Sequence, residues 1–254
     1  MKELLMEIVR DTGKLLLENF EKIKPAEILE RKAYDYSIVA DKLAEDNILT
    51  KLKEAGVKCK VVSEESGQIN LGDSGKVLFI DPLDGTLNYS VGIPHFCISI
   101  ALQKANEVIL GIVYDPSREE LFLAEKNKGA FLNNKRIEVS KNRDLRNSFC
   151  AVAFNYRDFK RSLLVEEKIR KVIRRVRNFG SAAIDFSWVA CGRLQGFVDM
   201  NLSPWDMAAG ALLVEEAGGK VTDFKGNNWH PYSKEILATN GIIHGELLRI
   251  IGEE

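Results

Sequence analysis

Apolar residues recur with two different periods along the chain, and these periods divide it into helical and extended segments. Helical spacing runs from Leu4 to Phe20 and stops at Pro25. A second helical pattern covers residues 37–56. The later segments predicted as helices are residues 158–177, 207–217 and 244–251, and a segment that opens at Gly180-Ser181 and ends at Ala190.

The segments between these helices have the pattern of strands. The run at residues 77–80 is apolar throughout, which is typical of a strand covered on both faces. A hairpin is predicted over residues 131–139, turning at Asn133-Asn134. Helices and strands come in blocks, which favours an α+β layered sandwich over a doubly wound sheet. The predicted strands are residues 60–62, 76–80, 96–102, 108–114, 120–124, 148–154, 196–200, 221–223 and 236–239.

Composition narrows the class of protein. A length of 254 residues fits one or two domains, and we expect a single unit over residues 1–254. The 36 Lys and Arg nearly balance 37 Asp and Glu, which argues against a general binder of nucleic acid or membrane surfaces. Acidic residues near the start do not suit a signal peptide, and no apolar run is long enough to span a bilayer. We therefore expect a cytoplasmic protein.

The four cysteines support the same compartment. Cys59, Cys97, Cys150 and Cys191 are widely spaced, and none forms a CxxC pair. Scattered cysteines suit a reducing cytoplasm, where buried thiols stay free. A disulfide remains an alternative if the source is a hyperthermophile.

The strongest chemical signal follows the apolar strand at residues 77–80. The chain continues Asp81-Pro82-Leu83-Asp84-Gly85-Thr86. Two carboxylates this close repel each other unless a cation neutralises them, and hard oxygen ligands suit Mg²⁺. The Gly85-Thr86 amides offer a phosphate site if a helix begins there. An Asx turn with a helix N-cap is an equally simple interpretation of the local pattern.

Three further acidic elements have ordinary interpretations when each is taken alone. Glu64-Glu65-Ser66 follows an apolar strand, although most Glu pairs are solvated surface. Asp206 opens a predicted helix and could be its N-cap. Asp41 lies in or beside the second helix.

Together these elements resemble the inositol monophosphatase family of Mg²⁺-dependent, lithium-sensitive sugar phosphatases. The resemblance rests on the segment from Phe79 to Thr86, on Trp205-Asp206-Met207-Ala208-Ala209-Gly210, and on Glu64-Glu65-Ser66 before them. It covers nearly the whole chain, and it is strongest to archaeal-type members that act as both fructose-1,6-bisphosphatase and inositol-1-monophosphatase. It implies an αβαβα sandwich, a homodimer, and a place in carbohydrate metabolism and gluconeogenesis.

The resemblance also implies a metal site with two or three Mg²⁺, for which Mn²⁺ can substitute. The implied ligands are Glu64, Asp81, Asp84, Asp206 and the backbone carbonyl of Leu83. Thr86 and Glu64 would orient the attacking water, and Asp41 would help to hold a water. Most ligands fall in the N-terminal half, about residues 1–140, and Asp206 falls in the C-terminal half, about residues 141–254.

The implied substrate is a small sugar or polyol phosphate. The Asp84 side chain and the amides of Gly85 and Thr86 would contact its phosphate end, and Gly180-Ser181-Ala182 and Asp199 would contact the polyol. Arg177 lies three residues before that turn and is predicted to reach a second phosphate. Inositol-specialised members carry Glu at the position of Asp199, so we do not expect strict inositol specificity.

Two alternatives remain open. One is a 3′(2′),5′-bisphosphate nucleotidase of the same superfamily, although no base-binding surface is recognisable. The other is a non-enzymatic relative that binds phosphate or RNA through the basic residues between Lys168 and Arg177. Ile169, Val172, Ile173 and Val176 recur there at helical spacing, so we expect an amphipathic helix with a solvated basic face and no nucleic-acid or membrane partner.

Overall fold

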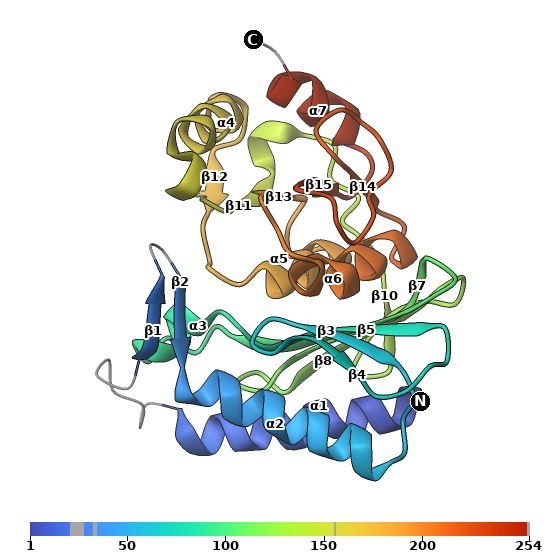
Figure 1. The fold of residues 1–254 in the computed structure, drawn as a ribbon. Coiled ribbons are helices and arrows are strands. Elements are labelled where there is room, and N and C mark those ends of the chain that lie inside the picture. Colours follow the sequence, from blue (N-terminus) through green and yellow to red (C-terminus); the bar gives the residue numbers. More distant parts are fainter. Residues whose placement is uncertain (21–27, 33–34, 155, 253–254) are drawn as a thin grey trace.

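The elements of the chain stack as alternating layers of helices and sheets in the computed structural model (Figure 1). The structure describes residues 1–20, 28–32, 35–154 and 156–252. From one side to the other, the layers are α1 with α2, an eight-stranded sheet, α5 with α6, a five-stranded sheet, and α4 with α7. The predicted αβαβα sandwich is therefore confirmed.

The larger sheet lies on α1 (Lys2–Asn19) and α2 (Val39–Glu54). Neighbouring strands are antiparallel except for β3 and β5, which are parallel. Parallel strands both end at the same edge of a sheet, so the segments that follow β3 and β5 emerge side by side. In spatial order the strands are β10 (Lys135–Ile137), β9 (Gly129–Leu132), β8 (Glu120–Glu125), β7 (Glu107–Asp115), β6 (Cys97–Lys104), β5 (Lys76–Asp84), β3 (Lys60–Ser63) and β4 (Gly67–Asn70).

The smaller sheet is covered on its outer face by α4 (Phe159–Val172) and α7 (His244–Gly252). Its strands β12, β11 and β13 are parallel, and β15 and β14 complete it in antiparallel fashion. In spatial order they are β12 (Arg175–Arg177), β11 (Phe149–Val152), β13 (Gly196–Met200), β15 (Glu235–Thr239) and β14 (Lys220–Thr222). Outside the two sheets lie the hairpin β1 (Ile28–Lys32) with β2 (Asp35–Ile38) and the short helix α3 (Thr86–Ser90).

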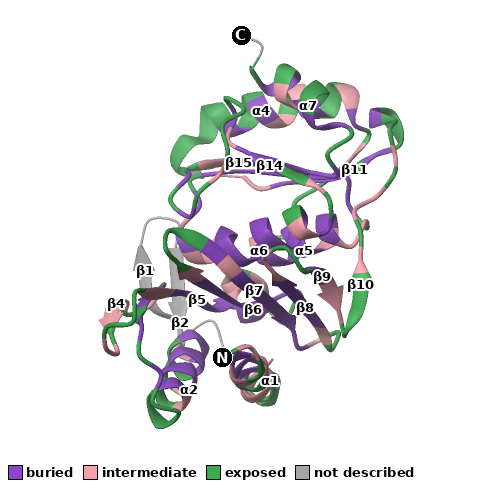
Figure 2. Ribbon diagram, turned by 90° about the vertical axis from the view of Figure 1, so that its right-hand side faces the viewer, coloured by how far each residue is buried: buried purple, intermediate pink, exposed green. Residues whose placement is uncertain are grey.

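The middle layer is the most deeply buried part of the molecule (Figure 2). Helices α5 (Ala182–Ala190) and α6 (Pro204–Glu216) are covered by a sheet on each side, so their sequences are apolar nearly all round. The two helices cross where Gly210 meets Phe186, and a Cβ on Gly210 would lie 2.4 Å from the Phe186 Cβ. This close crossing explains why the small residues of the second motif sit inside a helix.

Most predicted elements are confirmed, including the hairpin whose Asn133 and Asn134 both have positive φ. The helix predicted over residues 158–177 is wrong in its last part, because α4 ends at Val172 and residues 175–177 form β12. Ile173 is already extended, and β12 pairs with β11. Sheet pairing thus overrides the helical spacing of β-branched residues. Strand β4 and the hairpin of β1 and β2 were not predicted.

Two expectations from composition can be compared with the structure. In the described parts of the chain, no helix is both long and apolar enough to cross a membrane. All four cysteines are free thiols, and only Cys191 is not fully buried.

The crossing of α5 and α6 gives a prediction about stability. Gly210→Ala is expected to lower the free energy of unfolding by about 1–3 kcal/mol, because the new methyl group has no space beside Phe186. Gly245→Ala in α7 is the matched control, since nothing lies within 4 Å of its Cβ position and Ala favours helix. Chemical denaturation of both variants checks this, and equal stability of the two would contradict the packing argument.

Candidate active site

The first acidic motif lies at the carboxyl end of β5, an inner strand of the larger sheet. The middle helices α5 and α6 cover one face of that sheet (Figure 1). Asp81 is 1% exposed, and its Oδ1 accepts a hydrogen bond from the Leu83 amide at 3.1 Å. The register with β6 shifts between Asp81 and Asp84, so the strand is irregular where the carboxylates occur. Both carboxylates therefore leave the strand beside the layer of α5 and α6.

Gly85 makes the turn from β5 into α3 possible. Its φ is +93°, and a Cβ would lie 2.7 Å from the His95 carbonyl oxygen. Only glycine meets both conditions. The amides at the start of a helix have no acceptor within that helix, which is the arrangement expected for the phosphate contacts of Gly85 and Thr86.

Helix α2 brings Asp41 to the same place. The Thr86 hydroxyl lies 3.1 Å from Asp41 Oδ1 and 2.9 Å from the Leu83 carbonyl oxygen. One hydroxyl proton can serve only one of these acceptors at a time, which leaves a hydroxyl lone pair free to accept. Asp41 is 1% exposed. Asp41 thus meets Leu83 and Thr86 of the first acidic motif at one point.

The turn that carries Glu64 is attached to the same helix by two residues to which the sequence analysis gave no role. Glu45 is 2% exposed and accepts hydrogen bonds from both the amide and the hydroxyl of Ser66, the amide at 3.1 Å. Glu45 lies four residues after Asp41, so both side chains lie on one face of α2. The four-residue spacing from Asp41 was visible in the sequence, but the burial of Glu45 and its contact with Ser66 were not.

Asp206 comes from the middle layer. Its Oδ2 accepts the Ser203 amide at 2.7 Å, and the two residues form a capping box at the start of α6. The N-cap interpretation of Asp206 is therefore wrong in its position, because α6 begins at Pro204, Ser203 is the N-cap and Asp206 is the third helical residue. Asp206 still serves the cap through one carboxylate oxygen, and its other oxygen is not used there.

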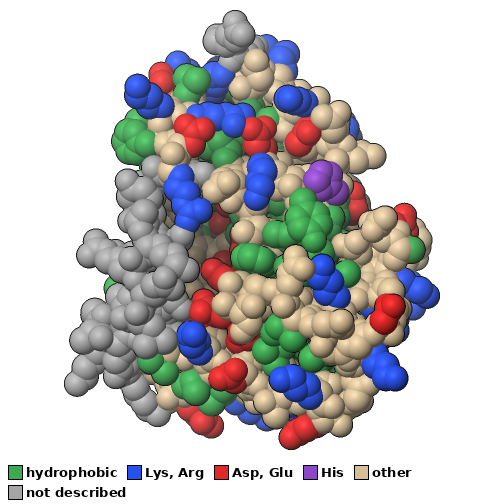
Figure 3. Space-filling view, viewed as in Figure 1, with side chains coloured by type: hydrophobic (Ala, Val, Ile, Leu, Met, Phe, Trp, Pro, Cys, Tyr) green, Lys and Arg blue, Asp and Glu red, His purple; other side chains and the backbone are tan. Residues whose placement is uncertain are grey.

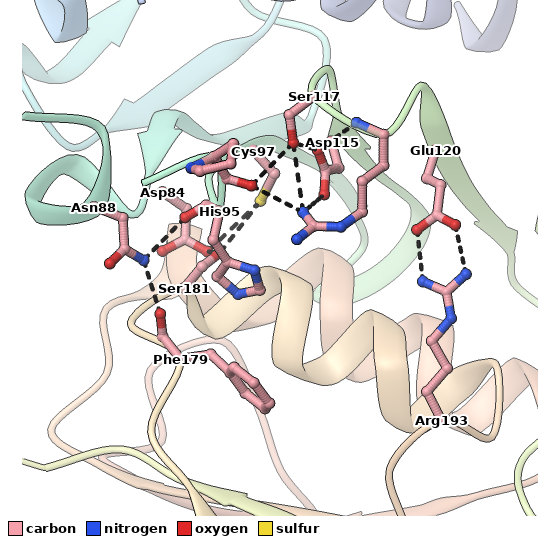
Figure 4. Close-up of polar contacts among 12 residues, drawn as sticks. Asp84, Asn88, His95, Cys97, Asp115, Ser117, Glu120, Phe179, Ser181 and Arg193 are labelled. Atoms are coloured by element: carbon pink, nitrogen blue, oxygen red, sulfur yellow. Dashed lines mark hydrogen bonds and ion pairs between the residues drawn. The ribbon is translucent and has the colours of Figure 1, made fainter. Parts of the chain in front are cut away.

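Asp84 joins the two halves of the molecule (Figure 4). Its carboxylate accepts hydrogen bonds from the Ser181 hydroxyl at 2.6 Å and from the Ala183 and Ala182 amides at 2.7 and 3.3 Å. These amides begin α5, so Asp84 caps a helix that belongs to the other half of the chain.

The turn before α5 is held in place by a second contact across the two halves. Asn88 donates to the carbonyl oxygens of His95 at 3.0 Å and Phe179 at 2.7 Å (Figure 4). The His95 ring packs against the Phe179 and Trp188 rings.

Crowding of the carboxylates changes their protonation. Burial, with repulsion from Glu64 and Asp84, holds the pKa of Asp81 well above its usual range. Burial raises the pKa of Asp206 to about 7 and also raises that of Asp84, although hydrogen bonds from Ser181 and the α5 amides oppose the rise at Asp84. In the described parts of the chain, no Lys, Arg or His forms an ion pair with any of these three groups.

Glu64 differs from these groups because much of its surface stays open to solvent. It lies deep enough among protein atoms that loss of hydration, with repulsion from Asp206 and Asp41, raises its pKa well above its usual range. Figure 3 shows Asp and Glu side chains gathered in a recess near the centre of one face, with Lys and Arg side chains above it. The recess is therefore acidic and reachable from solvent.

The donors at this site fit a divalent cation in chemistry, because all of them are hard oxygens and their charges repel in its absence. Over the residues that the structure covers, however, no three His, Cys, Asp or Glu side chains are grouped as a ready-made metal site. The Asp84 carboxylate is turned toward α5 by its hydrogen bonds to the Ser181 hydroxyl and the Ala183 amide. To bind an ion in the predicted way, the Asp84 carboxylate would have to coordinate the ion while it still accepts the hydrogen bonds from α5.

Some of the predicted substrate residues lie beside the acidic groups, and Arg177 is not shown in contact with them. Asp199 is the last residue but one of β13. Burial is the main cause that raises its pKa, and the charges of Asp206 and Asp84 add to the rise. Ser181 and Ala182 contact Asp84, and Gly180 precedes them in the turn beside Asn88. Arg177 is exposed in β12 and donates to the Val176 carbonyl oxygen at 3.0 Å.

Comparison with known proteins agrees with this fold and site. The model of the inositol monophosphatase family matches residues 1–254. A fructose-1,6-bisphosphatase/inositol-1-monophosphatase of Thermotoga maritima is 36% identical over 250 residues, covering 98% of this chain and 94% of that protein. The protein named Nus factor SuhB of Haemophilus influenzae is 35% identical over 254 residues, covering 99% of this chain and 95% of that protein.

A solved structure leads to the same conclusion. The Thermotoga maritima structure named IMPase superposes with a TM-score of 0.88 at 33% identity, covering 99% of this chain and 97% of that chain. The chain shares its layered sandwich with this phosphatase structure. It belongs to the inositol monophosphatase family. Members of this family are generally metal-dependent phosphatases.

The contact between Glu45 and Ser66 gives a prediction about metal affinity. Ser66→Ala is expected to raise the Mg²⁺ concentration needed for half-maximal phosphatase activity by about tenfold, because the turn carrying Glu64 loses a hydrogen bond to α2. Ser74→Ala is the control, since that exposed hydroxyl bonds the Lys58 carbonyl away from the site. Unchanged Mg²⁺ dependence in Ser66→Ala would show that Glu45 does not position Glu64.

Proposed function

We propose that this protein is a Mg²⁺-dependent phosphomonoesterase that hydrolyses fructose-1,6-bisphosphate and inositol-1-phosphate. The observation that carries the proposal is the convergence of acidic groups from β5, α2, α6 and the turn after β3 on one recess. The two substrates come from the resemblance to dual-activity members and from the printed name of the Thermotoga maritima relative.

The acidic residues around the recess would bind the metal ions. Glu64, Asp81, Asp84, Asp206 and the Leu83 carbonyl would hold two or three Mg²⁺, with Mn²⁺ able to substitute. When bound, these ions would supply an acidified water and neutralise charge on the phosphoryl group and the leaving oxygen. The acidic site would otherwise repel a phosphate dianion.

The protein itself orients the water and the substrate. Thr86 has a lone pair that can accept a hydrogen bond from water while its own hydroxyl donates to Asp41 or to the Leu83 carbonyl oxygen. The carboxylate of Glu64 is the nearby group that can take a proton from that water. Amides of Gly85 and Thr86 would hold phosphate oxygens, and Asp199 would accept a hydrogen bond from a sugar hydroxyl. Positioning and charge thus supply most of the catalysis, as is usual in phosphoryl transfer.

The non-enzymatic alternative is worth considering because one relative is named Nus factor SuhB. It depends on a continuous basic helix over residues 168–177, and the described structure divides that segment between α4 and β12. The full set of predicted acidic residues is retained, which favours the phosphatase. A 3′(2′),5′-bisphosphate nucleotidase would use the same acidic recess, so only substrate comparison separates it from our proposal.

The direct test is phosphate release from fructose-1,6-bisphosphate, inositol-1-phosphate and a 3′,5′-bisphosphate nucleotide. Release from the first two that stops with chelator is the expected result. Asp84→Asn is expected to lower kcat/KM by about 100-fold or more with the fold retained, because one charged oxygen donor is lost. Asp73→Asn, on an exposed turn, is the control.

Two outcomes would contradict the proposal. Chelator-resistant release, or unchanged turnover in Asp84→Asn, would remove the metal site from the mechanism. Preference for the nucleotide would keep the site and replace the substrates.

A further inference from the structure

Asp185 is a buried carboxyl group that has no part in the proposed mechanism. It is the fourth residue of α5, the helix that is covered by a sheet on each side, and it is 2% exposed. Its Oδ1 is enclosed and has no hydrogen-bond partner among the described residues. Buried polar atoms in folded proteins are nearly always hydrogen-bonded to protein or to water, so this oxygen needs a partner from outside the described chain.

Strand β13 directs Asp199 toward the same helix. Phe197 of this strand packs on Phe186 of α5, with ring centroids 4.8 Å apart. Val198 and Met200 belong to the apolar cluster on the opposite face, with residues of α4 and α7. Side chains alternate along a strand, so Asp199 points toward α5 as Phe197 does.

Three buried acids therefore lie around the start of α5, and they differ in their hydrogen bonds. Asp84 accepts from the amides that begin the helix. Asp199 Oδ1 accepts the Met200 amide at 2.5 Å, whereas Asp185 Oδ1 accepts nothing. In the parts of the chain that the structure covers, no Lys, Arg or His forms an ion pair with Asp185 or Asp199.

The Asp185 carboxyl is suited to a water molecule because it is neutral. Burial, with repulsion from Asp84 and Asp199, holds its pKa well above the usual range, so it keeps its proton. A neutral carboxyl has one proton to donate and an oxygen that accepts, as water does. Internal waters bond about three otherwise unsatisfied polar groups, and the Asp199 oxygen that the Met200 amide does not use is a second such group.

We propose that Asp185 is a positioning residue for Asp199 and acts through one water molecule enclosed between α5 and β13. The Asp185 carboxyl donates a hydrogen bond to this water, and the water donates to the Asp199 carboxylate. A hydrogen bond to the ionised form favours that form, so Asp199 stays an acceptor for a sugar hydroxyl in spite of its burial. The inference rests on the proposed function for the assignment of Asp199 to that hydroxyl.

The kinetic test compares Asp185→Leu with Asp185→Asn in the full chain. Leu has a similar size and no hydrogen-bonding group, so kcat/KM for inositol-1-phosphate should fall roughly 10-fold, mainly through KM. The Asn amide can still bond the water, so Asp185→Asn should stay within about threefold of the natural sequence. Neither variant should change kcat/KM for p-nitrophenyl phosphate by more than about twofold, because that ester has no hydroxyl for Asp199 to bind.

Ser187→Ala is the matched control. Ser187 is also a buried polar residue of α5, but its hydroxyl donates to the Ala183 carbonyl oxygen within the helix. This variant should therefore show no difference between the two substrates. Asp185→Leu is expected to fold, since an apolar group replaces a buried acid that has no charged partner, and chemical denaturation checks this.

Crystal structures separate this inference from the proposed function, because they need no turnover. In the natural sequence we expect a water within hydrogen-bond distance of both Asp185 Oδ1 and the Asp199 carboxylate. In Asp185→Leu that water should be absent and the Asp199 side chain should be turned or less ordered. If no substrate is hydrolysed, the proposed function fails, and these structures still decide whether Asp185 positions Asp199.

Four results would overturn the inference. The first is a crystal structure of the natural sequence without this water. The second is an equal loss of activity on both substrates in Asp185→Leu, and the third is no loss on either. The fourth is an Asp185→Asn variant as impaired on inositol-1-phosphate as Asp185→Leu.

Discussion

Repulsion among buried carboxylates is the constraint on which the rest of this structure depends. Asp81 and Asp84 lie in the last part of a buried strand, and Asp206 lies in the first turn of a helix between two sheets. The hydrogen bonds that remain available to them come from the fold itself, through the amides of Leu83, Ala183 and Ser203. These bonds relieve the repulsion only in part, so the pKa values stay raised. A folded protein that keeps such groups together stores electrostatic energy that a cation can release.

The middle layer is the element that makes this arrangement possible. Helix α5 starts at the Asp84 carboxylate and α6 carries Asp206 in its first turn, so both helices present their N-termini to the recess. The partial positive charge of a helix N-terminus favours nearby carboxylates. Packing of Gly210 against Phe186 keeps the two helices close enough for both to face one site. Fold and site therefore depend on the same crossing.

The block order of helices and strands predicted a layered α+β fold, because strand and helix periods are local signals. The αβαβα order and the candidate acidic residues came from the resemblance of whole motifs to a known family. The sequence did not predict β12, whose β-branched residues fit a helix until they pair with β11. It gave no role to Glu45 and Ser66, since a hydrogen bond between residues 21 positions apart leaves no local pattern. The hydrogen bond from Ser181 to Asp84 joins residues 97 positions apart, which only the folded chain brings together.

Thermal unfolding of the natural sequence and of Glu64→Gln, each with chelator and with Mg²⁺, tests the central claim most directly. Glu64 is repelled by Asp206 and Asp41, so removing its charge should leave the protein at least as stable in chelator. Mg²⁺ should raise the Tm of the natural sequence, because an ion that binds only the folded state stabilises it. Glu64→Gln should lose most of that rise. Lower stability of Glu64→Gln in chelator, together with no effect of Mg²⁺ on either protein, would contradict the account.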